Sequence, residues 1–317
     1  MGCLSPLKGY RSRKINKDTG KYPITFKPSK NSYTDVDGLF IPCGVCEGCR
    51  LARSFQWSCR CCLEMLTCSE CYMLNLTYDN DHLPEDKGLR RSHFQSFMKR
   101  LRYYFPDSKI RVFYCGEYGD NRRRPHYHAI VFNLPLKARY IPMFYVSNSK
   151  KNNPLYACPL IEKIWGQGMV RIGSVTRKSC SYVAQYTLKK NKSLNSYCEK
   201  RGIAKPFVGA SSRPALGRRF FEKYFLDIYN RGFFAPFPDE PKKVVRPLKY
   251  FDYLLEKLYP ILYIKFVRIP REIYFRKERL KKLYNPELWT EEYASKLQQR
   301  IKREKRILRK LEQRLDM

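Results

Sequence analysis

Two of the four histidines in the chain, His126 and His128, flank Tyr127 in a short apolar segment. The segment has the composition of a strand, and side chains alternate across a strand. His126 and His128 are therefore expected on one face, with Tyr127 on the other. Two imidazoles on one face are a suitable start for a divalent metal site. An isolated His-x-His pair is more often a polar pair on the surface than a metal site. The neighbouring residues therefore decide between these two interpretations.

A third ligand is available from the segment before the histidines. Glu117 ends a second apolar segment, and the polar turn over residues 119–125 joins the two segments as a hairpin would. A hairpin would bring Glu117 beside the histidines; if Glu117 faced away, Asp79 or Asp81 would be the next candidates. Two histidines and one carboxylate leave coordination positions open, as a catalytic metal requires. Mg²⁺ or Mn²⁺ fits phosphoryl chemistry, and imidazole ligands favour Mn²⁺.

A candidate nucleophile follows the histidines along the chain. Tyr182 and Tyr186 are four residues apart in a predicted helix over residues 179–190, so they share one helix face. Lys189 lies on the same side and Lys190 follows it. A tyrosyl oxygen can attack a phosphodiester and keep its energy in a phosphotyrosine bond, and a nearby lysine could stabilise the phenolate or protonate the leaving oxygen. The chain has 25 tyrosines, so a pair of them alone does not indicate a nucleophile. The position of this pair after the histidines and the lysines next to it are what favour a catalytic role.

Cysteine spacing predicts a second, structural metal site. Cys43, Cys46 and Cys49 form a C-x₂-C-x₂-C array with intervening glycines, which suits a zinc ion. A fourth ligand is needed, and Cys59 is one candidate. An iron–sulfur cluster also fits the spacing, but phosphoryl transfer needs no redox centre. Four further cysteines are interpreted as buried reduced thiols: Cys61, Cys62, Cys68 and Cys71.

The charge of the chain indicates a polyanionic partner. The 317 residues carry a net charge of +34, spread over the whole length, and nucleic acid is the leading polyanion. The turn residues Arg122, Arg123 and Arg124, together with Lys190, are expected to contact phosphates. No run of about 18 apolar residues and no signal-peptide pattern occurs. We therefore expect no membrane contact, and a reducing cytoplasm in which the cysteines are not disulfides.

The elements that must position these residues form a predicted α+β core over residues 72–225. Strands are expected at residues 72–78, 110–118, 126–134 and 168–173, with a helix at residues 92–105. Ser92 could cap this helix, with Gln95 as its capping-box partner. A basic, cysteine-rich segment over residues 1–71 precedes the core.

A basic and mostly helical extension over residues 226–317 follows the core. Its residues 290–315 are predicted to form a helix with apolar side chains close to heptad spacing. These are Leu297, Ile301, Leu308, Leu311 and Leu315. The pattern fits self-association as a coiled coil, and it fits docking against the chain's own core equally well.

Five motifs in this order resemble one known family. They are LNLTY, FMKRLR, CGEYGDNRRRPHYHAIVF, SYVAQYTLKK and SSRPALG. Together they resemble the replication initiators of small icosahedral single-stranded DNA phages, specifically the gokushovirus-type microviruses of the HUH endonuclease superfamily. The resemblance covers about residues 3–225. Leu188 and Ala215 depart from the familiar segments, and neither belongs to the expected chemistry.

The resemblance implies a central antiparallel sheet flanked by helices, and a rolling-circle mechanism. A divalent metal would be held by Glu117, His126 and His128. Tyr182 or Tyr186 would nick single-stranded origin DNA, remain joined to the 5′-phosphate and leave a 3′-OH for the host polymerase; the second tyrosine could accept the next transfer and rejoin the strands. The partners would be origin DNA and the host replication machinery, including helicase and polymerase, in the cytoplasm of an infected bacterium. The resemblance to this family also favours Cys3 as the fourth zinc ligand.

Two other functions compete with this interpretation. A non-enzymatic, zinc-stabilised DNA-binding or packaging protein would share the charge and the cysteines, but it gives no reason for the order of Glu117, the histidines and the tyrosines. A transposase or mobilisation relaxase would share the chemistry and differ in the DNA it processes.

Overall fold

The computed structural model describes residues 3–17, 22–32, 39–119, 122–149, 152–185 and 192–285, with isolated positions beyond residue 285. The chain divides into two compact units, one of residues 1–53 with 277–317 and one of residues 54–276. No helix within the described ranges is long and apolar enough to cross a membrane. The domain boundaries expected from the sequence, after residues 71 and 225, stay predictions.

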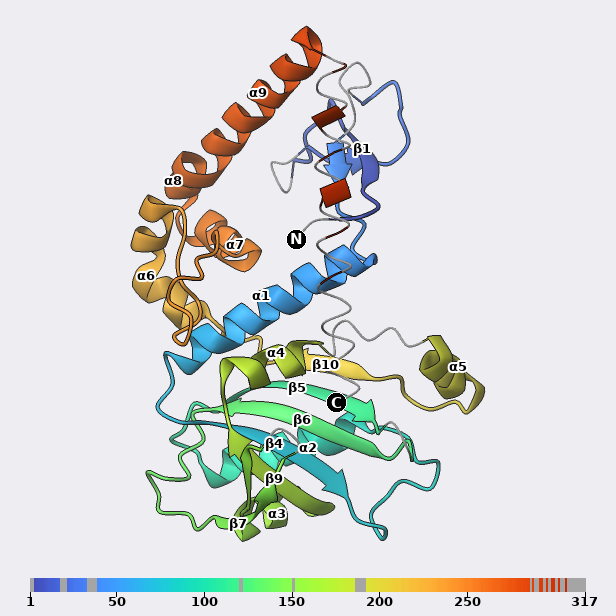
Figure 1. The fold of residues 1–317 in the computed structure, drawn as a ribbon, viewed down its shortest axis with the longest axis vertical. Coiled ribbons are helices and arrows are strands. Elements are labelled where there is room, and N and C mark those ends of the chain that lie inside the picture. Colours follow the sequence, from blue (N-terminus) through green and yellow to red (C-terminus); the bar gives the residue numbers. More distant parts are fainter. Residues whose placement is uncertain are drawn as a thin grey trace. The chain divides into compact units, whose positions relative to one another are not determined.

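The larger unit is built on a seven-stranded antiparallel sheet with the order β10-β5-β6-β4-β9-β8-β7 (Figure 1). The strands are β4 (Cys71–Tyr78), β5 (Arg111–Tyr118), β6 (Pro125–Phe132), β7 (Phe144–Asn148), β8 (Pro154–Ala157), β9 (Gly168–Ser174) and β10 (Phe207–Ala210). The predicted α+β fold with an antiparallel sheet is confirmed, and β4, β5, β6 and β9 are the four strands expected from the sequence.

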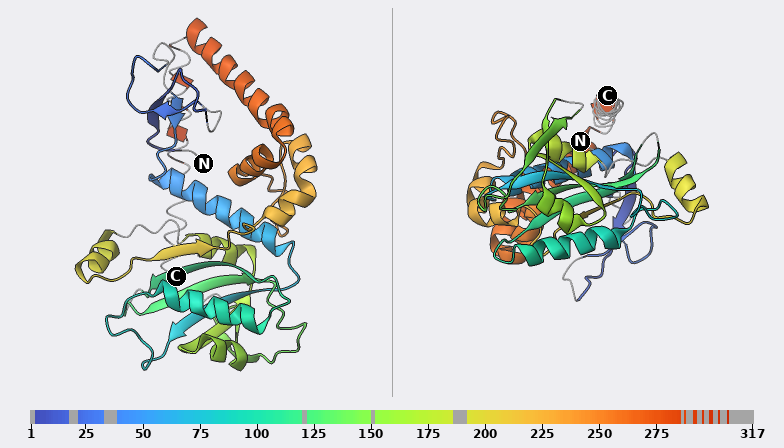
Figure 2. Two further views of the ribbon diagram at one scale, coloured as in Figure 1. Left: turned by 180° about the vertical axis from the view of Figure 1, so that it is seen from behind. Right: turned by 90° about the horizontal axis from the view of Figure 1, so that it is seen from below.

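Helices cover both faces of this sheet (Figures 1 and 2). The helical elements are α1 (Glu47–Met65), α2 (Arg91–Tyr104), α3 (Pro159–Trp165), α4 (Arg177–Gln185), α5 (Lys192–Lys200), α6 (Arg218–Arg231), α7 (Lys249–Leu258), α8 (Pro260–Tyr263), the π-helix η1 (Ile264–Arg268) and α9 (Ile269–Tyr284). α2 and α3 pack on one face, while α4, α6, α7 and the part of α1 in this unit pack on the other. The sheet therefore separates two apolar cores.

Strand β6 shows how the alternation places the candidate site. Tyr127, Ala129 and Val131 belong to the core under α2 and α3, whereas Ile130 and Phe132 belong to the core under α1 and α4. His126 and His128 share the parity of Ile130, so they face the α4 side. A slip of one residue would bury both histidines under α2, and the apolar pattern prevents it.

The start of α2 differs from the expected capping box. The helix begins at Arg91 and its N-cap is Arg90, which makes no side-chain cap bond; Ser92 lies within the first turn. Sheet tyrosines hold this end instead. The Tyr127 hydroxyl donates to the Arg90 carbonyl (2.8 Å) and accepts from the Arg90 N–H (3.1 Å), and the Leu89 N–H donates to the Tyr118 hydroxyl (3.0 Å). The residue between the two histidines thus anchors α2 on the opposite face.

A buried ion pair joins α1 to β5. Glu64 and Arg111 are both buried, with Oε1 and Nη1 2.8 Å apart. The other Glu64 oxygen accepts a bond from the Gly217 N–H at 2.7 Å, and Arg111 donates to the Pro214 carbonyl. These contacts connect three separate segments of the chain at one place.

The smaller unit contains a three-stranded sheet with the order β2-β1-β3. Its strands are β1 (Leu7–Arg11), β2 (Ile24–Thr25) and β3 (Leu39–Ile41). A side chain at Gly9 in the middle strand would force its neighbours to shift, because a Cβ there would lie 2.6 Å from Ile41 Cδ1 and 2.7 Å from Ile24 Cγ2.

Candidate metal centre and nucleophile

Glu117, His126 and His128 converge at the paired ends of β5 and β6. Glu117 lies directly opposite His126 in the antiparallel register. Its Oε1 is 3.0 Å from His126 Nε2 and 2.9 Å from His128 Nε2. The three ligand atoms lie within 4.8 Å of one another, on the face expected from the sequence. The alternative Asp79 instead accepts hydrogen bonds from His82.

The outer nitrogens of the two imidazoles are fixed by acceptors. His128 Nδ1 is 2.5 Å from Asn75 Oδ1, and His126 Nδ1 is 3.1 Å from the Arg124 carbonyl oxygen. Since both partners accept, each Nδ1 carries the proton, and each Nε2 turns its lone pair toward Glu117. Such outer contacts orient and tune metal-bound histidines. Asn75 was missed by sequence reasoning, although it is a polar residue within an apolar strand, directly across from His128.

This donor set fits a divalent cation. Two imidazole lone pairs aimed at one carboxylate oxygen repel it unless a positive charge lies among them. Burial raises the pKa of Glu117. When the imidazoles are also protonated at Nε2, their hydrogen bonds and positive charge outweigh burial and hold that pKa well below its usual range. The site is therefore a buried carboxylate with two oriented nitrogens, and imidazole with carboxylate suits Mn²⁺ and related ions.

Tyr182 contacts this group from α4. Its ring lies edge-to-face against His128, with centroids 5.5 Å apart and planes at 85°. Cys180, Val183 and Ala184 on the same helix are buried in the core with strands β5 and β6. Ser181 Oγ also bonds Ser58 Oγ at 2.8 Å. These contacts fix the helix orientation, which places Tyr182 beside the histidines.

The remaining members of the predicted nucleophile segment lie outside the described residues. α4 begins at Arg177 and is described to Gln185, so its start lies before the predicted residue 179. Tyr186, Lys189 and Lys190 fall in the undescribed range 186–191. Their expected roles stay predictions.

The arginines of the β5–β6 turn have different surroundings. Arg122 is exposed. The Arg123 guanidinium lies over the Tyr197 ring, 4.0 Å from its centroid. Arg124 donates to the Tyr78 carbonyl at 2.9 Å and to Asn80 Oδ1 at 3.1 Å. Arg124 thus ties the turn to β4 while its own carbonyl holds His126, so its side chain has a positioning role besides the phosphate contact that was expected.

Four cysteines of the smaller unit converge as a second candidate metal site. The sulfurs of Cys3, Cys43, Cys46 and Cys49 lie within 4.8 Å of one another. The Cys3 and Cys46 sulfurs are 3.7 Å apart. Tetrahedral zinc with zinc–sulfur bonds of about 2.3 Å separates its ligands by about 3.8 Å. The geometry therefore favours Cys3 over Cys59, which is buried in the apolar core of the other unit.

Backbone N–H groups surround these sulfurs. The Leu4 N–H donates to Cys46, the Cys43 N–H to Cys3 and the Cys46 N–H to Cys43, at 3.2–3.3 Å. Burial opposes ionisation of Cys46, but bonds from the Leu4 and Cys49 backbone outweigh it and lower the pKa of Cys46 to about 6. Burial raises the pKa of Cys49 to about 12. Backbone hydrogen bonds also lower the pKa of Cys43, whereas burial raises that of Cys3, so a cation would be needed chiefly to stabilise the Cys3 and Cys49 thiolates.

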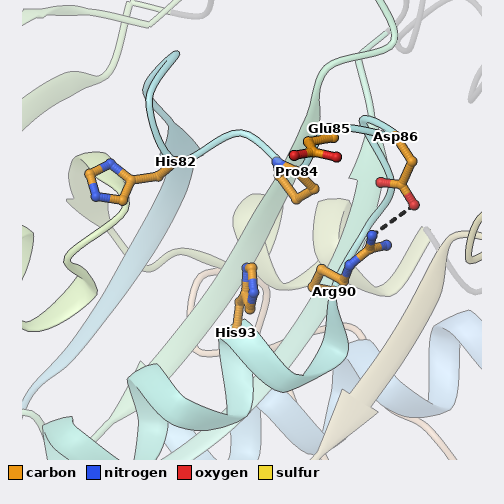
Figure 3. A pocket seen from close by; sticks show the side chains of 6 residues that line it. All are labelled: His82, Pro84, Glu85, Asp86, Arg90 and His93. Carbon is orange, nitrogen blue, oxygen red and sulfur yellow. Dashed lines mark hydrogen bonds and ion pairs between the residues drawn. The ribbon is translucent and has the colours of Figure 1, made fainter.

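A hollow of about 470 Å³ lies at the start of α2 (Figure 3). Its lining consists of His82, Pro84, Glu85, Asp86, Arg90 and His93. Asp86 pairs with Arg90 at 2.7 Å, which leaves the Glu85 carboxylate as excess negative charge. Phosphate is disfavoured there, so the hollow is a poor candidate for the DNA path.

Comparison with known proteins shows what the chain is similar to. The family model for replication-associated protein ORF2/G2P matches residues 71–191, which include the candidate metal ligands and both tyrosines. Replication-associated protein ORF2 of Spiroplasma virus 4 is 29% identical over 290 residues, 86% of each chain. The chain is similar to replication-associated proteins of phages. This confirms the predicted resemblance to a microvirus-type replication initiator.

Two further relatives carry the same description. Replication-associated protein VP4 of Bdellovibrio phage phiMH2K is 29% identical over 252 residues, 74% of this chain and 71% of the relative. Replication-associated protein ORF4 of Chlamydia phage 1 is 30% identical over 224 residues, 67% of this chain and 56% of the relative. No solved structure matches this chain.

Proposed function

We propose that this replication-associated protein initiates rolling-circle replication as an HUH-type, metal-dependent tyrosine endonuclease and strand transferase. The observation that carries the proposal is the contact of Tyr182 with His128, whose Nε2 converges with His126 and Glu117. A nucleophile and a metal can act on one phosphate only if both reach it. Under this proposal, the nicking reaction takes place in the infected bacterial host.

In the proposed reaction, one of the chain's own tyrosines is the nucleophile. A tyrosyl oxygen, of Tyr182 or of Tyr186, attacks the phosphorus of the scissile phosphodiester. The new bond joins the 5′-phosphate to the tyrosine, the bond from phosphorus to the 3′-oxygen breaks, and the phenolic proton leaves with the 3′-OH. In the reverse direction a 3′-OH attacks the phosphotyrosine, which rejoins the strand and releases the tyrosine.

Glu117, His126 and His128 would hold the divalent ion, Mg²⁺ or Mn²⁺. The ion would withdraw negative charge from the scissile phosphate. Asn75 and the Arg124 carbonyl keep the two imidazoles in the tautomer that presents Nε2. The four-cysteine group would hold a structural Zn²⁺, independent of the nicking chemistry.

A labelled single-stranded oligonucleotide with the viral origin tests the proposal. With Mn²⁺ or Mg²⁺ added, we expect a protein–DNA adduct that survives denaturation, together with a free 3′-OH fragment. His126→Ala should abolish the adduct through loss of the metal. An unmodified protein that binds the origin but never forms an adduct, with either ion, would favour the non-enzymatic DNA-binding alternative.

A further inference from the structure

The Tyr197 ring of α5 is contacted by two arginines from separate segments of the chain. The Arg123 guanidinium lies over this ring, 4.0 Å from its centroid, and the Arg201 guanidinium also lies over it, at 5.5 Å. Arg123 belongs to the turn between β5 and β6, and Arg201 directly follows α5. The fold therefore brings together two positive charges that are distant in the sequence, on a ring that is attractive to each of them.

No carboxylate neutralises these two guanidinium groups within the described part of the chain. Both arginines are exposed, and neither forms an ion pair with a described residue. Glu199, two residues before Arg201, pairs instead with Lys205. Two like charges held at one ring repel each other, and an anion bound by both would relieve that repulsion. The charge at this place therefore favours an anionic partner.

The backbone at Arg123 has a conformation that arginine rarely adopts. Its φ is +48°, in the left-handed region that favours glycine. The Arg123 N–H donates to the Gly119 carbonyl at 2.9 Å, which closes the turn in this shape. Glycine would fit this position with less strain, so the turn itself does not require an arginine. Strained residues of this kind are frequent in sites that bind ligands.

Both arginines are held near the candidate metal ligands. Arg123 directly precedes Arg124, whose carbonyl oxygen is 3.1 Å from His126 Nδ1. Tyr118, the last residue of β5, donates through its hydroxyl to the Ala204 carbonyl at 2.7 Å, which holds the segment after α5 at the end of that strand. An anion bound by the two arginines would therefore lie beside the strand ends that carry the metal ligands.

We propose that the arginine pair, defined as Arg123 and Arg201, binds a backbone phosphate of the substrate strand next to the scissile phosphate. The Tyr197 ring holds both guanidinium groups in place. Arginine presents a planar set of donors that matches the oxygens of a phosphate. The inference rests on the proposed function, because it assigns positioning residues for the strand that is cut.

The effect of salt on DNA affinity tests the arginine pair. Fluorescence anisotropy with the full chain, without added divalent metal, gives the affinity for a single-stranded oligonucleotide of about 12 nucleotides at several salt concentrations. Arg123→Gly and Arg201→Ala should each weaken binding about tenfold. In each variant the slope of log affinity against log salt should become shallower by about 0.7, the value for one phosphate of a single strand. Because both arginines bind the same phosphate, the double variant should bind little more weakly than either single variant.

Two controls separate DNA binding from folding. Arg231→Ala removes an exposed arginine at the end of α6, which lies at the opposite end of this unit from α5 (Figures 1 and 2), and it should change neither the affinity nor the slope. Thermal unfolding should show that Arg123→Gly keeps its fold, because glycine accepts the positive φ. Partial unfolding lowers the fraction of active protein but not the salt slope. A lower affinity with an unchanged slope would therefore overturn the inference.

Oligonucleotides that each contain one neutral methylphosphonate linkage locate the bound phosphate. A neutral linkage next to the nick should weaken binding to the unmodified protein, and the double variant should bind this strand and the normal strand alike. At saturating DNA with Mn²⁺, the double variant should still form the covalent adduct, because its metal ligands are intact. Unchanged affinity and slope in both single variants would overturn the inference whether or not the protein nicks DNA. If the variants lose affinity and slope but the unmodified protein forms no adduct, the result would support the arginine pair and count against the proposed nuclease.

Discussion

His128 donates through Nδ1 to the side-chain oxygen of Asn75, across a distance of 2.5 Å between strands β6 and β4. Its other nitrogen, Nε2, is 2.9 Å from Glu117. One imidazole thus connects a polar residue of the sheet to the candidate metal ligands, and the first contact determines the tautomer available for the second.

Loss of the Asn75 oxygen should weaken metal binding. Asn75→Ala removes the acceptor that orients His128, and outer contacts of this type are worth about 10–100-fold in metal affinity. Asn75→Asp keeps an acceptor at the same place and should retain binding. Titration with Mn²⁺, followed by electron paramagnetic resonance, compares the three proteins. An Asn75→Ala variant with unchanged Mn²⁺ affinity would remove Asn75 from the account of the site.

The cysteine group should bind one zinc ion per chain. Cys46→Ser should lose it, because the Cys46 sulfur is one of the four that converge and backbone hydrogen bonds lower the pKa of Cys46 to about 6. Cys59→Ser is the control and should keep the ion. Metal analysis by mass spectrometry measures the content of each protein. Retention of zinc by Cys3→Ser together with its loss from Cys59→Ser would support Cys59 as the fourth ligand instead of Cys3.

The Glu64–Arg111 pair should be important for stability. Glu64→Ala leaves Arg111 buried without its partner and should cost about 3–5 kcal/mol of unfolding free energy. The exposed pair of Arg218 and Glu222 gives the comparison, since its loss in Glu222→Ala should cost about 0–1 kcal/mol. Urea unfolding followed by fluorescence measures both. If both variants lost the same unfolding free energy, burial of the Glu64–Arg111 pair would not increase its contribution to stability.

The sequence predicted those parts of the fold that depend on local pattern. The two strands around the Arg122–Arg124 turn have near-continuous apolar character, and alternation within β6 placed both histidines on one face. Strands β7, β8 and β10 escaped prediction because they are short, and β10 also depends on pairing with β5, far earlier in the chain. The capping box at Ser92 was wrong because contacts from Tyr118 and Tyr127, distant in sequence, hold the start of α2.

The candidate site was predictable to a similar degree. Glu117 could be placed because a hairpin fixes its register with His126, whereas Asn75 needed the pairing of β4 with β6, which no local pattern reveals. Spacing in the cysteine array predicted three of the four cysteines that converge. Cys3 is 40 residues from Cys43, so only the family resemblance suggested it before the fold brought it near.

The central claim is that a tyrosine of α4 or just after it, Tyr182 or Tyr186, becomes joined to DNA. The direct measurement is peptide mapping by mass spectrometry after reaction with an origin oligonucleotide, digestion and nuclease trimming. We predict a nucleotide attached to Tyr182 or Tyr186. Changing both to Phe should abolish the adduct and leave DNA affinity nearly unchanged, because phosphate contacts dominate that affinity. A nucleotide on any other residue, or an adduct that persists in the double Phe variant, would contradict the account.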